Sequence, residues 1–226
     1  MQQIPKNYIV AIDGVSGSGK SSTAQAVADR LHIFHLDTGA MYRAITYLAM
    51  QAGLPVDAAD TIADLTSKVA ISVSPEGKLL FDGRSLAAEI RKPDVSAKVS
   101  DYCKIPKVRE ILVQKQREIG ARQSTVMEGR DIGSVVFPQA QFKFFMWASP
   151  EVRAKRRLLE LQAKHIDASF EEVLHNLQER DEKDSSRDHS PLFKAPDAVE
   201  IDTSGLTFAE QVAMITELVL KKQPSL

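Results

Sequence analysis

The stretch GVSGSGKSS, residues 14–22, limits what this chain can fold into more than any other part of the sequence. A short apolar run precedes it and a helix-forming segment follows, so strand, glycine-rich loop and helix come in that order. The stretch fits the pattern GxxxxGK[ST], in which glycines let consecutive N–H groups point toward a phosphate and the helix N-terminus adds partial positive charge. We expect Lys20 to reach the β and γ phosphates of a nucleotide and the Ser21 hydroxyl to bind Mg²⁺. The motif therefore predicts a site for ATP or GTP.

The predicted strands are five short runs rich in β-branched and aromatic residues, at 8–13, 32–37, 124–129, 142–148 and 198–203. Most are apolar on both faces, which is typical of parallel strands with helices packed on each side. Helix starts are predicted between them, by a serine N-cap before proline at 149–150 and by capping boxes at Ser169–Glu172 and Thr207–Glu210. The sequence therefore predicts an α/β fold built around a parallel sheet.

Two segments interrupt this alternation of strands and helices. Residues 70–84 alternate apolar and polar side chains around a Pro-Glu-Gly turn, which predicts a β-hairpin with one solvent-facing side. Residues 149–190 are highly charged and mostly helical, and their last eleven residues, RDEKDSSRDHS, contain no hydrophobic side chain. Neither segment supplies a core strand, so we expect both to be insertions at the rim of the sheet.

Composition narrows the possible partners and the location. Lys and Arg total 29 against 30 for Asp and Glu, so the chain lacks an overall positive charge for holding a nucleic-acid backbone. The single cysteine, Cys103, can form neither an internal disulfide nor a cysteine-rich zinc cluster, and we expect it to be buried. No signal peptide is visible and no apolar run approaches the roughly 20 residues that span a bilayer, so we expect a soluble, cytoplasmic chain.

Polar residues follow the second predicted strand, at the edge where open α/β sheets bind their ligands. In the segment LDTGAMYRA, either Asp37 or Thr38 is expected to be the N-cap of a helix. Arg43 lies one and a half turns into that helix, close enough to the rim of the sheet to bind a phosphate.

Charged residues also follow the third predicted strand, in the segment TVMEGRD. Arg130 either forms a structural ion pair with Asp131 or binds a ligand, and the sequence leaves both readings open. Glu128 and Asp131 make the position of a Walker B carboxylate ambiguous. The Asn-Lys-x-Asp motif of regulatory GTPases is absent from the sequence, which argues against a regulatory GTPase.

Five segments together resemble the bacterial cytidylate kinase family: IDGVSGSGKSS, LDTGAMYRA, VREILVQKQR, EGRDIGSVVFP and ERDEKDSSRDHSPL. The glycine loop is shared by many families, whereas EGRDIGSVVFP together with ERD and the downstream arginine is more specific. The resemblance implies a five-stranded parallel P-loop kinase core with helices on both faces, formed by 1–37, 109–148 and 191–226. It also implies an enlarged domain for the nucleoside monophosphate (NMP) in 38–108 and a helical lid in 149–190. The implied activity is transfer of the γ-phosphoryl group of ATP to CMP or dCMP, with Mg²⁺, by a monomer.

The same resemblance implies which residues form the site. Those implied to bind ATP are Gly14, Val15, Ser16, Gly17, Ser18, Gly19, Lys20, Ser21, Ser22 and Arg157, with the metal at Ser21. Those implied to be catalytic are Lys20, Arg130, Arg180 and Arg187. Those implied to bind CMP are Thr38, Tyr42, Arg43, Ser100, Arg109, Arg130, Asp131, Asp184 and Arg187. Within this last set Asp184 is expected on the ribose hydroxyls, and Asp131, Ser100 and Arg109 on cytosine. Arg153 and Arg156 share the helical spacing of Arg157, and a solvated face is the equal alternative for all three.

Three residues depart from the usual family pattern: Val15, Thr38 and Glu128. The extra methyl group of Thr38 leaves the preference among CMP, dCMP and UMP open. Alternative functions are a kinase for another small acceptor such as UMP, and an NTP-dependent switch protein. Nucleic-acid binding through the basic helix at 104–122 is a weaker alternative, because two glutamates interrupt its positive stripe.

Overall fold

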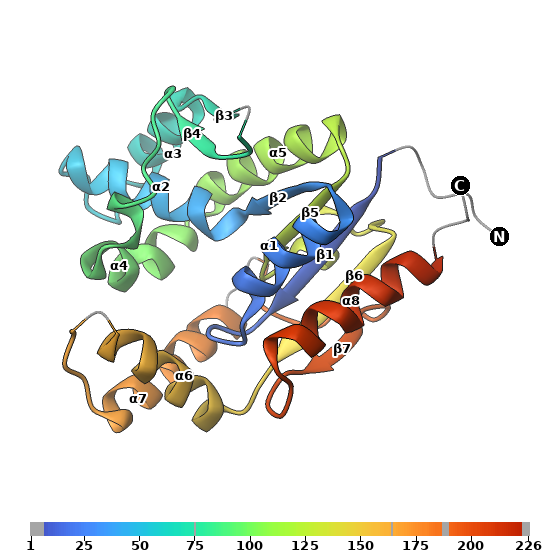
Figure 1. Cartoon of the computed structure of the whole chain (residues 1–226). Coiled ribbons are helices and arrows are strands. Elements are labelled where there is room, and N and C mark those ends of the chain that lie inside the picture. The colour runs from blue at the N-terminus through green and yellow to red at the C-terminus, as the bar shows by residue number, and fades with distance from the viewer. Residues whose placement is uncertain (1–6, 75, 164, 187–189, 223–226) are drawn as a thin grey trace. The chain divides into compact units, whose positions relative to one another are not determined.

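The computed structural model describes residues 7–74, 76–163, 165–186 and 190–222 (Figure 1). The chain divides into two compact units, one made of 1–36 with 123–226 and the other of 37–122. Among the described residues, no helix combines the length and the apolar character that are needed to cross a membrane.

The first unit is built on a five-stranded sheet with the order β2-β5-β1-β6-β7. The strands are β1 (Ile9–Gly14), β2 (Phe34–Asp37), β5 (Thr125–Gly129), β6 (Phe142–Trp147) and β7 (Val199–Asp202). β1 pairs in parallel with β5 and β6, and β6 pairs in parallel with β7. Every residue of β1 is buried, as expected for a central strand that is covered on both faces. The predicted α/β fold with a five-stranded parallel sheet is confirmed.

Helices α1 (Lys20–Leu31) and α8 (Phe208–Lys222) cover one face of this sheet (Figure 1). Their apolar sides pack against the strands, in a core that includes Ile12 and Ile215. A short π-helical turn, η2 (Ile132–Val136), follows β5 and packs against β1. The phosphate loop therefore joins the central strand to a helix that is firmly packed on the sheet.

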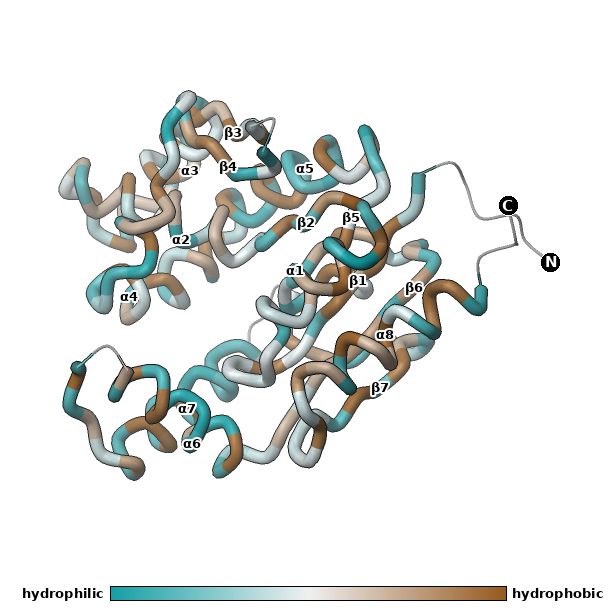
Figure 2. Tube along the Cα trace, viewed as in Figure 1, coloured by the Kyte–Doolittle hydropathy of each residue, from teal (hydrophilic) through white to brown (hydrophobic). Residues whose placement is uncertain are grey.

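Two further helices of the first unit, α6 (Pro150–Gln162) and α7 (Phe170–Ser185), pack side by side and share a small hydrophobic core of their own. Figure 2 shows hydrophilic residues alternating with hydrophobic ones along both helices. Their predicted starts are confirmed: the Ser149 side chain accepts a hydrogen bond from the α6 backbone, and Ser169 forms the reciprocal capping box with Glu172. The capping box predicted before α8 also forms.

The second unit contains α2 (Thr38–Gln51), α3 (Ala59–Lys68), η1 (Glu89–Arg91), α4 (Pro93–Cys103), α5 (Pro106–Arg122) and the strands β3 (Ile71–Val73) and β4 (Leu79–Phe81). The antiparallel pairing of β3 with β4 confirms the predicted hairpin, and Cys103 is buried as predicted. Helix α5 packs on α2, α3 and α4, so all of it belongs to this unit, whereas the resemblance implied that the core resumes at residue 109. The division into core, NMP-binding domain and lid stays a prediction.

Candidate active site

The loop between β1 and α1 has the backbone that a phosphate site requires. Gly14 has a φ of 148°, and a Cβ atom there would lie 1.9 Å from the carbonyl oxygen of Met146, because β1 and β6 are paired at this point. Gly19 is the N-cap of α1 and has a φ of 89°, in the left-handed region that glycine adopts at little cost. The first turn of α1 contains no acidic residue, so no side chain of that turn offsets the partial positive charge of the helix N-terminus. The segment from Gly14 to Ser22 is therefore suited to an anion.

Lys20 is the first residue of α1 and is buried. Its Nζ donates a hydrogen bond to the carbonyl oxygen of Val15 at 2.8 Å. Burial, followed by repulsion from Arg130, lowers the pKa of Lys20 to about 7, and Arg180 acts in the same direction. Lys20 therefore lies close enough to Arg130 and Arg180 for both charges to oppose its protonation. An anionic ligand beside them would favour the charged form of Lys20 and raise its pKa again.

Arg130 leaves the carboxyl end of β5 and is held by a carboxylate from α7. Its Nε donates to Oδ2 of Asp184 at 2.8 Å, and its Nη1 donates to the carbonyl oxygen of Gly129 at 3.2 Å. Asp184 is only 2% exposed and the Arg130 side chain 20%, so the two form a partly buried ion pair between residues 54 positions apart in the sequence. The structure thus joins two of the predicted site residues through a contact that sequence spacing did not suggest. Asp131 is buried at the start of η2.

Glu128, the residue whose role the sequence left ambiguous, lies beside Ser21. The Ser21 hydroxyl donates to Oε2 of Glu128 at 2.7 Å, and His35 Nε2 lies 3.2 Å from Oε1. Burial by itself opposes ionisation of Glu128, but the hydrogen bond from His35 and the charge of Lys20 hold its pKa below the ordinary value. A hydroxyl and an ionised carboxylate side by side are oxygen donors of the kind that hard divalent cations prefer.

Arg153, rather than Arg157, is the arginine of α6 that meets the phosphate loop. Its Nη1 donates to the carbonyl oxygen of Ser16 at 3.0 Å and to Oδ2 of Asp181 on α7 at 2.5 Å. Asp181 in turn accepts from the Ser16 N–H at 3.4 Å. Arg157 is exposed and pairs with Glu160 on its own helix at 2.8 Å. One buried guanidinium therefore ties both helices to the loop, whereas the other faces solvent.

Replacing Arg153 with methionine is expected to raise the KM for ATP by about tenfold or more, because hydrogen bonds to a charged group contribute roughly 1.5–3 kcal/mol. Arg157→Met, one turn along the same helix, is the matched variant, and its ion pair with Glu160 is too exposed to matter much. Steady-state kinetics with varied ATP measures both. If the KM for ATP rises more in Arg157→Met than in Arg153→Met, this expectation is contradicted. That result would support the contact between Arg157 and ATP that the family resemblance implies.

The second unit holds the remaining predicted CMP-binding residues near the start of α2. Asp37, one of the two predicted candidates, is the N-cap: one carboxylate oxygen accepts from the Ala40 N–H at 2.9 Å, and the other accepts from Arg43 at 2.9 Å. The guanidinium of Arg109 lies over the ring of Tyr42, 5.2 Å from its centroid. The N-cap carboxylate therefore also fixes the direction of the predicted phosphate-binding arginine.

The other predicted residues are distributed as follows. Thr38 is buried at the first position of α2, and Ser100 is half-buried on α4. Arg187 lies outside the described residues. Asp131 belongs to the first unit whereas Ser100 and Arg109 belong to the second, so their meeting around cytosine stays a prediction.

A phosphate loop with a buried lysine, a serine beside a carboxylate, and two arginines whose charges act on that lysine define a P-loop phosphotransferase. The family model "Cytidylate kinase" matches residues 10–221. A cytidylate kinase of Caldanaerobacter subterraneus is 46% identical over 212 residues, which are 94% of each chain. One of Fervidobacterium nodosum is 45% identical over 94% of this chain and 96% of its own. The chain belongs to the cytidylate kinase family, as its motifs predicted, and is a nucleoside monophosphate kinase.

A solved structure of an uncharacterized protein from Eubacterium ventriosum has the same fold. Its TM-score is 0.51 at 13% identity, and the match covers 96% of this chain and 97% of that one. At this identity the likeness concerns the fold alone.

Proposed function

We propose that this protein transfers the γ-phosphoryl group of ATP to CMP or dCMP, giving ADP and CDP or dCDP. The observation that carries the proposal is the group of three cations, Lys20, Arg130 and Arg180, at a phosphate loop in a chain of this family. Phosphoryl transfer depends mainly on aligning two nucleotides and neutralising charge at the transferring group, so such a cluster supplies the main requirement.

The residues of the chain would act by position and charge. The phosphate loop would hold the β and γ phosphates of ATP, with Lys20 charged once the anion is present. Arg130 and Arg180 would face the transferring group, and α6 and α7 would exclude water from it. No side chain needs to act as a general base, because the acceptor phosphate is already a nucleophilic anion.

We assign Mg²⁺ to Ser21 and Glu128. The fit rests on their donor chemistry: two oxygen ligands 2.7 Å apart, one of them an ionised carboxylate, suit a metal that usually binds one or two carboxylates together with substrate phosphates. Among the described residues no cluster of three His, Cys, Asp or Glu could hold a metal by itself. When bound, the ion would neutralise charge on the β and γ phosphates.

The acceptor would be recognised by the predicted CMP-binding residues. Asp184 would accept from the ribose hydroxyls, and Arg43 and Arg187 would bind the monophosphate. Cytosine presents one amino donor and two acceptors, which Asp131, Ser100 and Arg109 match respectively. Arg109 stacked on Tyr42 is a preorganised donor for such a base.

An acceptor screen tests the proposed function. The purified chain, with ATP and Mg²⁺, is given CMP, dCMP, UMP, AMP or GMP, and the release of ADP is measured together with the phosphorylated product. CMP and dCMP are expected to give the highest kcat/KM, and EDTA is expected to abolish turnover. A preference for UMP would support the alternative acceptor, and ATP hydrolysis without a phosphorylated product would support the switch protein.

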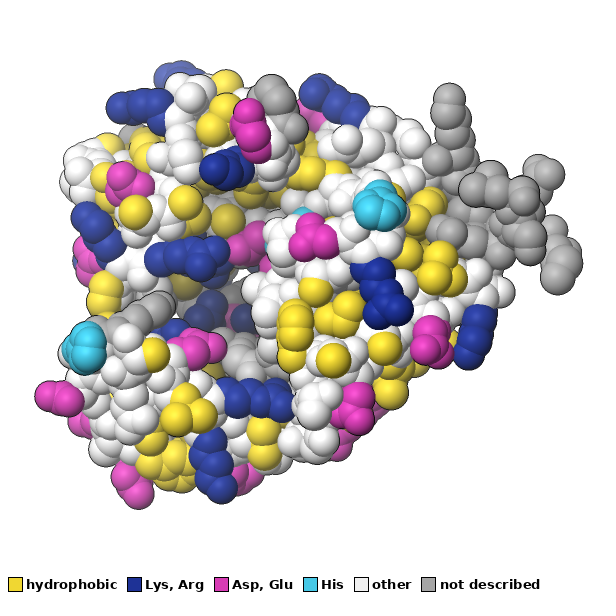
Figure 3. All heavy atoms as spheres, viewed as in Figure 1, with side chains coloured by type: hydrophobic (Ala, Val, Ile, Leu, Met, Phe, Trp, Pro, Cys, Tyr) yellow, Lys and Arg dark blue, Asp and Glu magenta, His cyan; other side chains and the backbone are white. Residues whose placement is uncertain are grey.

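The remaining expectations concern partners and location. On the face shown in Figure 3, Lys and Arg side chains are interspersed with Asp and Glu instead of forming one basic patch, which offers no support for nucleic-acid binding. A monomer in the cytoplasm stays a prediction.

A further inference from the structure

Asp13 is a buried carboxylate that lies within the motif IDGVSGSGKSS but is not among the predicted site residues. It lies next to the end of β1, is 5% exposed, and points to the face of the sheet opposite Ile12, because successive side chains of a strand alternate. Its Oδ1 accepts from the N–H of Ile132 at 2.8 Å, and its Oδ2 accepts from the N–H of Gly133 at 2.7 Å. One carboxylate therefore holds the first two backbone donors of η2.

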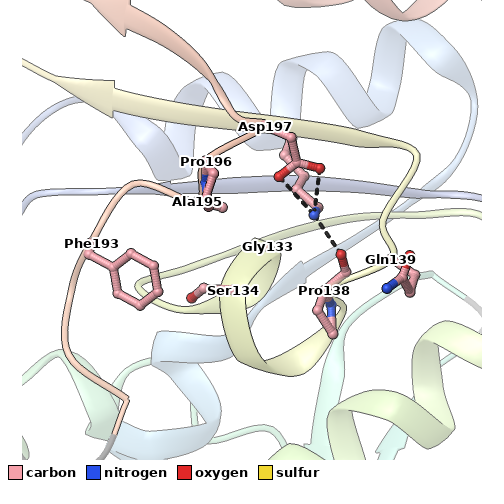
Figure 4. Close-up of a pocket in the computed structure, with 9 residues that line it drawn as sticks. Gly133, Ser134, Pro138, Gln139, Phe193, Ala195, Pro196 and Asp197 are labelled. Carbon is pink, nitrogen blue, oxygen red and sulfur yellow. Dashed lines mark hydrogen bonds and ion pairs between the residues drawn. The ribbon is translucent and has the colours of Figure 1, made fainter.

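Gly133 is enclosed between Asp13 and the stem of Lys143. A Cβ atom at Gly133 would lie 3.4 Å from Oδ2 of Asp13 and 3.2 Å from Cδ of Lys143. Lys143, on β6, is itself anchored, since its Nζ donates to the carbonyl oxygen of Pro138 at 2.6 Å and to the Asp197 carboxylate at 2.8 Å. Figure 4 shows these bonds at the wall of a cavity of about 360 Å³. The start of η2 is thus held from two sides.

This turn comes directly after two predicted site residues. Only Arg130 and Asp131 separate Gly129, at the end of β5, from Ile132, so both ends of this short connection are fixed. We propose that Asp13 is a positioning residue, which holds the N–H groups of Ile132 and Gly133 and thereby sets the direction of Arg130 and Asp131. We call the two hydrogen bonds from the Ile132 and Gly133 N–H groups to Asp13 the brace. The identity of the acceptor that Arg130 and Asp131 meet rests on the proposed function, whereas the brace does not.

Asparagine is the most informative replacement for Asp13. It has the shape of aspartate but one oxygen acceptor, and its NH₂ group would face a backbone N–H that also donates. Because one buried donor is then left without an acceptor, the turn should lose its fixed position. Asp13→Asn is expected to lower kcat/KM for CMP by about 30-fold or more, chiefly through KM, and to leave the KM for ATP within about threefold of the wild-type value.

The matched control is Asp202→Asn, an exposed aspartate at the carboxyl end of β7 that accepts from the nearby Ser204 N–H at 2.8 Å. Amide hydrogen exchange of the substrate-free protein gives a second readout, in which Ile132 and Gly133 should exchange at least tenfold faster in Asp13→Asn and at the wild-type rate in Asp202→Asn. If CMP is not the acceptor, exchange still tests the brace, and kinetics are repeated with the acceptor that the screen identifies.

Two outcomes would overturn the proposal. Faster exchange with an unchanged KM for the acceptor means that the brace does not position the site, and unchanged exchange means that Asp13 does not hold the turn. If Asp13→Asn fails to fold, Gly133→Ala is used, since its methyl group must displace the Lys143 stem from 3.2 Å. That variant is expected to raise the KM for the acceptor at least tenfold, and a wild-type KM would overturn the proposal.

Discussion

Lys20→Met is expected to lower kcat by at least about 1,000-fold, since removing a charge that stabilises a phosphoryl or oxyanion transition state costs this much or more. Methionine keeps the length and the apolar stem of lysine but cannot donate to the β and γ phosphates. Steady-state kinetics with CMP measures the loss, and Lys221→Met at the exposed end of α8 is the control. Turnover near the wild-type rate would contradict the role of Lys20 in the phosphate loop.

The same substitution is expected to stabilise the fold at neutral pH by about 1–3 kcal/mol, because it removes a buried cation. The pKa of Lys20 is about 7 in the folded chain, whereas the ordinary pKa of a lysine side chain is 10.5. At 1.36 kcal/mol per pH unit this difference sets an upper limit of about 5 kcal/mol, which the lost bond to Val15 reduces.

The stabilisation expected for Lys20→Met should depend on pH. Between pH 7 and 10.5 the unfolded chain binds more protons at Lys20 than the folded chain does, so this residue makes the free energy of unfolding rise with pH across that window. The methionine variant lacks this contribution, and its advantage should shrink from pH 7 to pH 10. Urea unfolding at the two pH values measures the difference. An advantage that grows with pH would show that Lys20 is not the buried cation responsible.

Asp184→Ala is expected to lower kcat/KM for CMP by about 100-fold or more and the free energy of unfolding by about 1.5–3 kcal/mol, because it leaves the partly buried Arg130 guanidinium without its charged partner. Loss of the proposed ribose contact adds to the first effect. Since dCMP lacks the 2′ hydroxyl, its kcat/KM should fall less than that of CMP.

Asp184→Asn separates the two roles. Its remaining oxygen can still accept from Arg130 Nε, so most of the stability should return while the charged acceptor for the ribose hydroxyls is gone. Kinetics with both acceptors and urea unfolding of both variants provide the measurements. Equal losses for CMP and dCMP would argue against the ribose contact and leave Asp184 as the partner of Arg130 alone.

Features that depend on near neighbours in the chain were predictable. The phosphate loop, the five strands, the hairpin and the helix caps at Asp37, Ser149 and Ser169 all follow from local backbone preference and periodicity, and each is present. Family motifs added the role of the loop and the acceptor class. The capping boxes could be predicted because the two residues of each box lie within one helical turn.

Contacts between distant segments were not predictable. Helical spacing makes Arg153 and Arg157 look alike, and only the packing of α6 and α7 decides which guanidinium reaches the loop. Arg130 had an acidic neighbour in the sequence, yet its ion pair is formed with a residue of α7.

The sequence by itself determined the class of protein, because the phosphate loop, the strand pattern and the family motifs each depend on residues that are close together in the chain. The tertiary structure alone decided how the charges are shared: Glu128 beside Ser21, Asp184 against Arg130, and Asp13 under η2. The physical reason is that a buried charge must find its partner wherever folding brings one within about 3 Å, and that distance has no counterpart in sequence spacing.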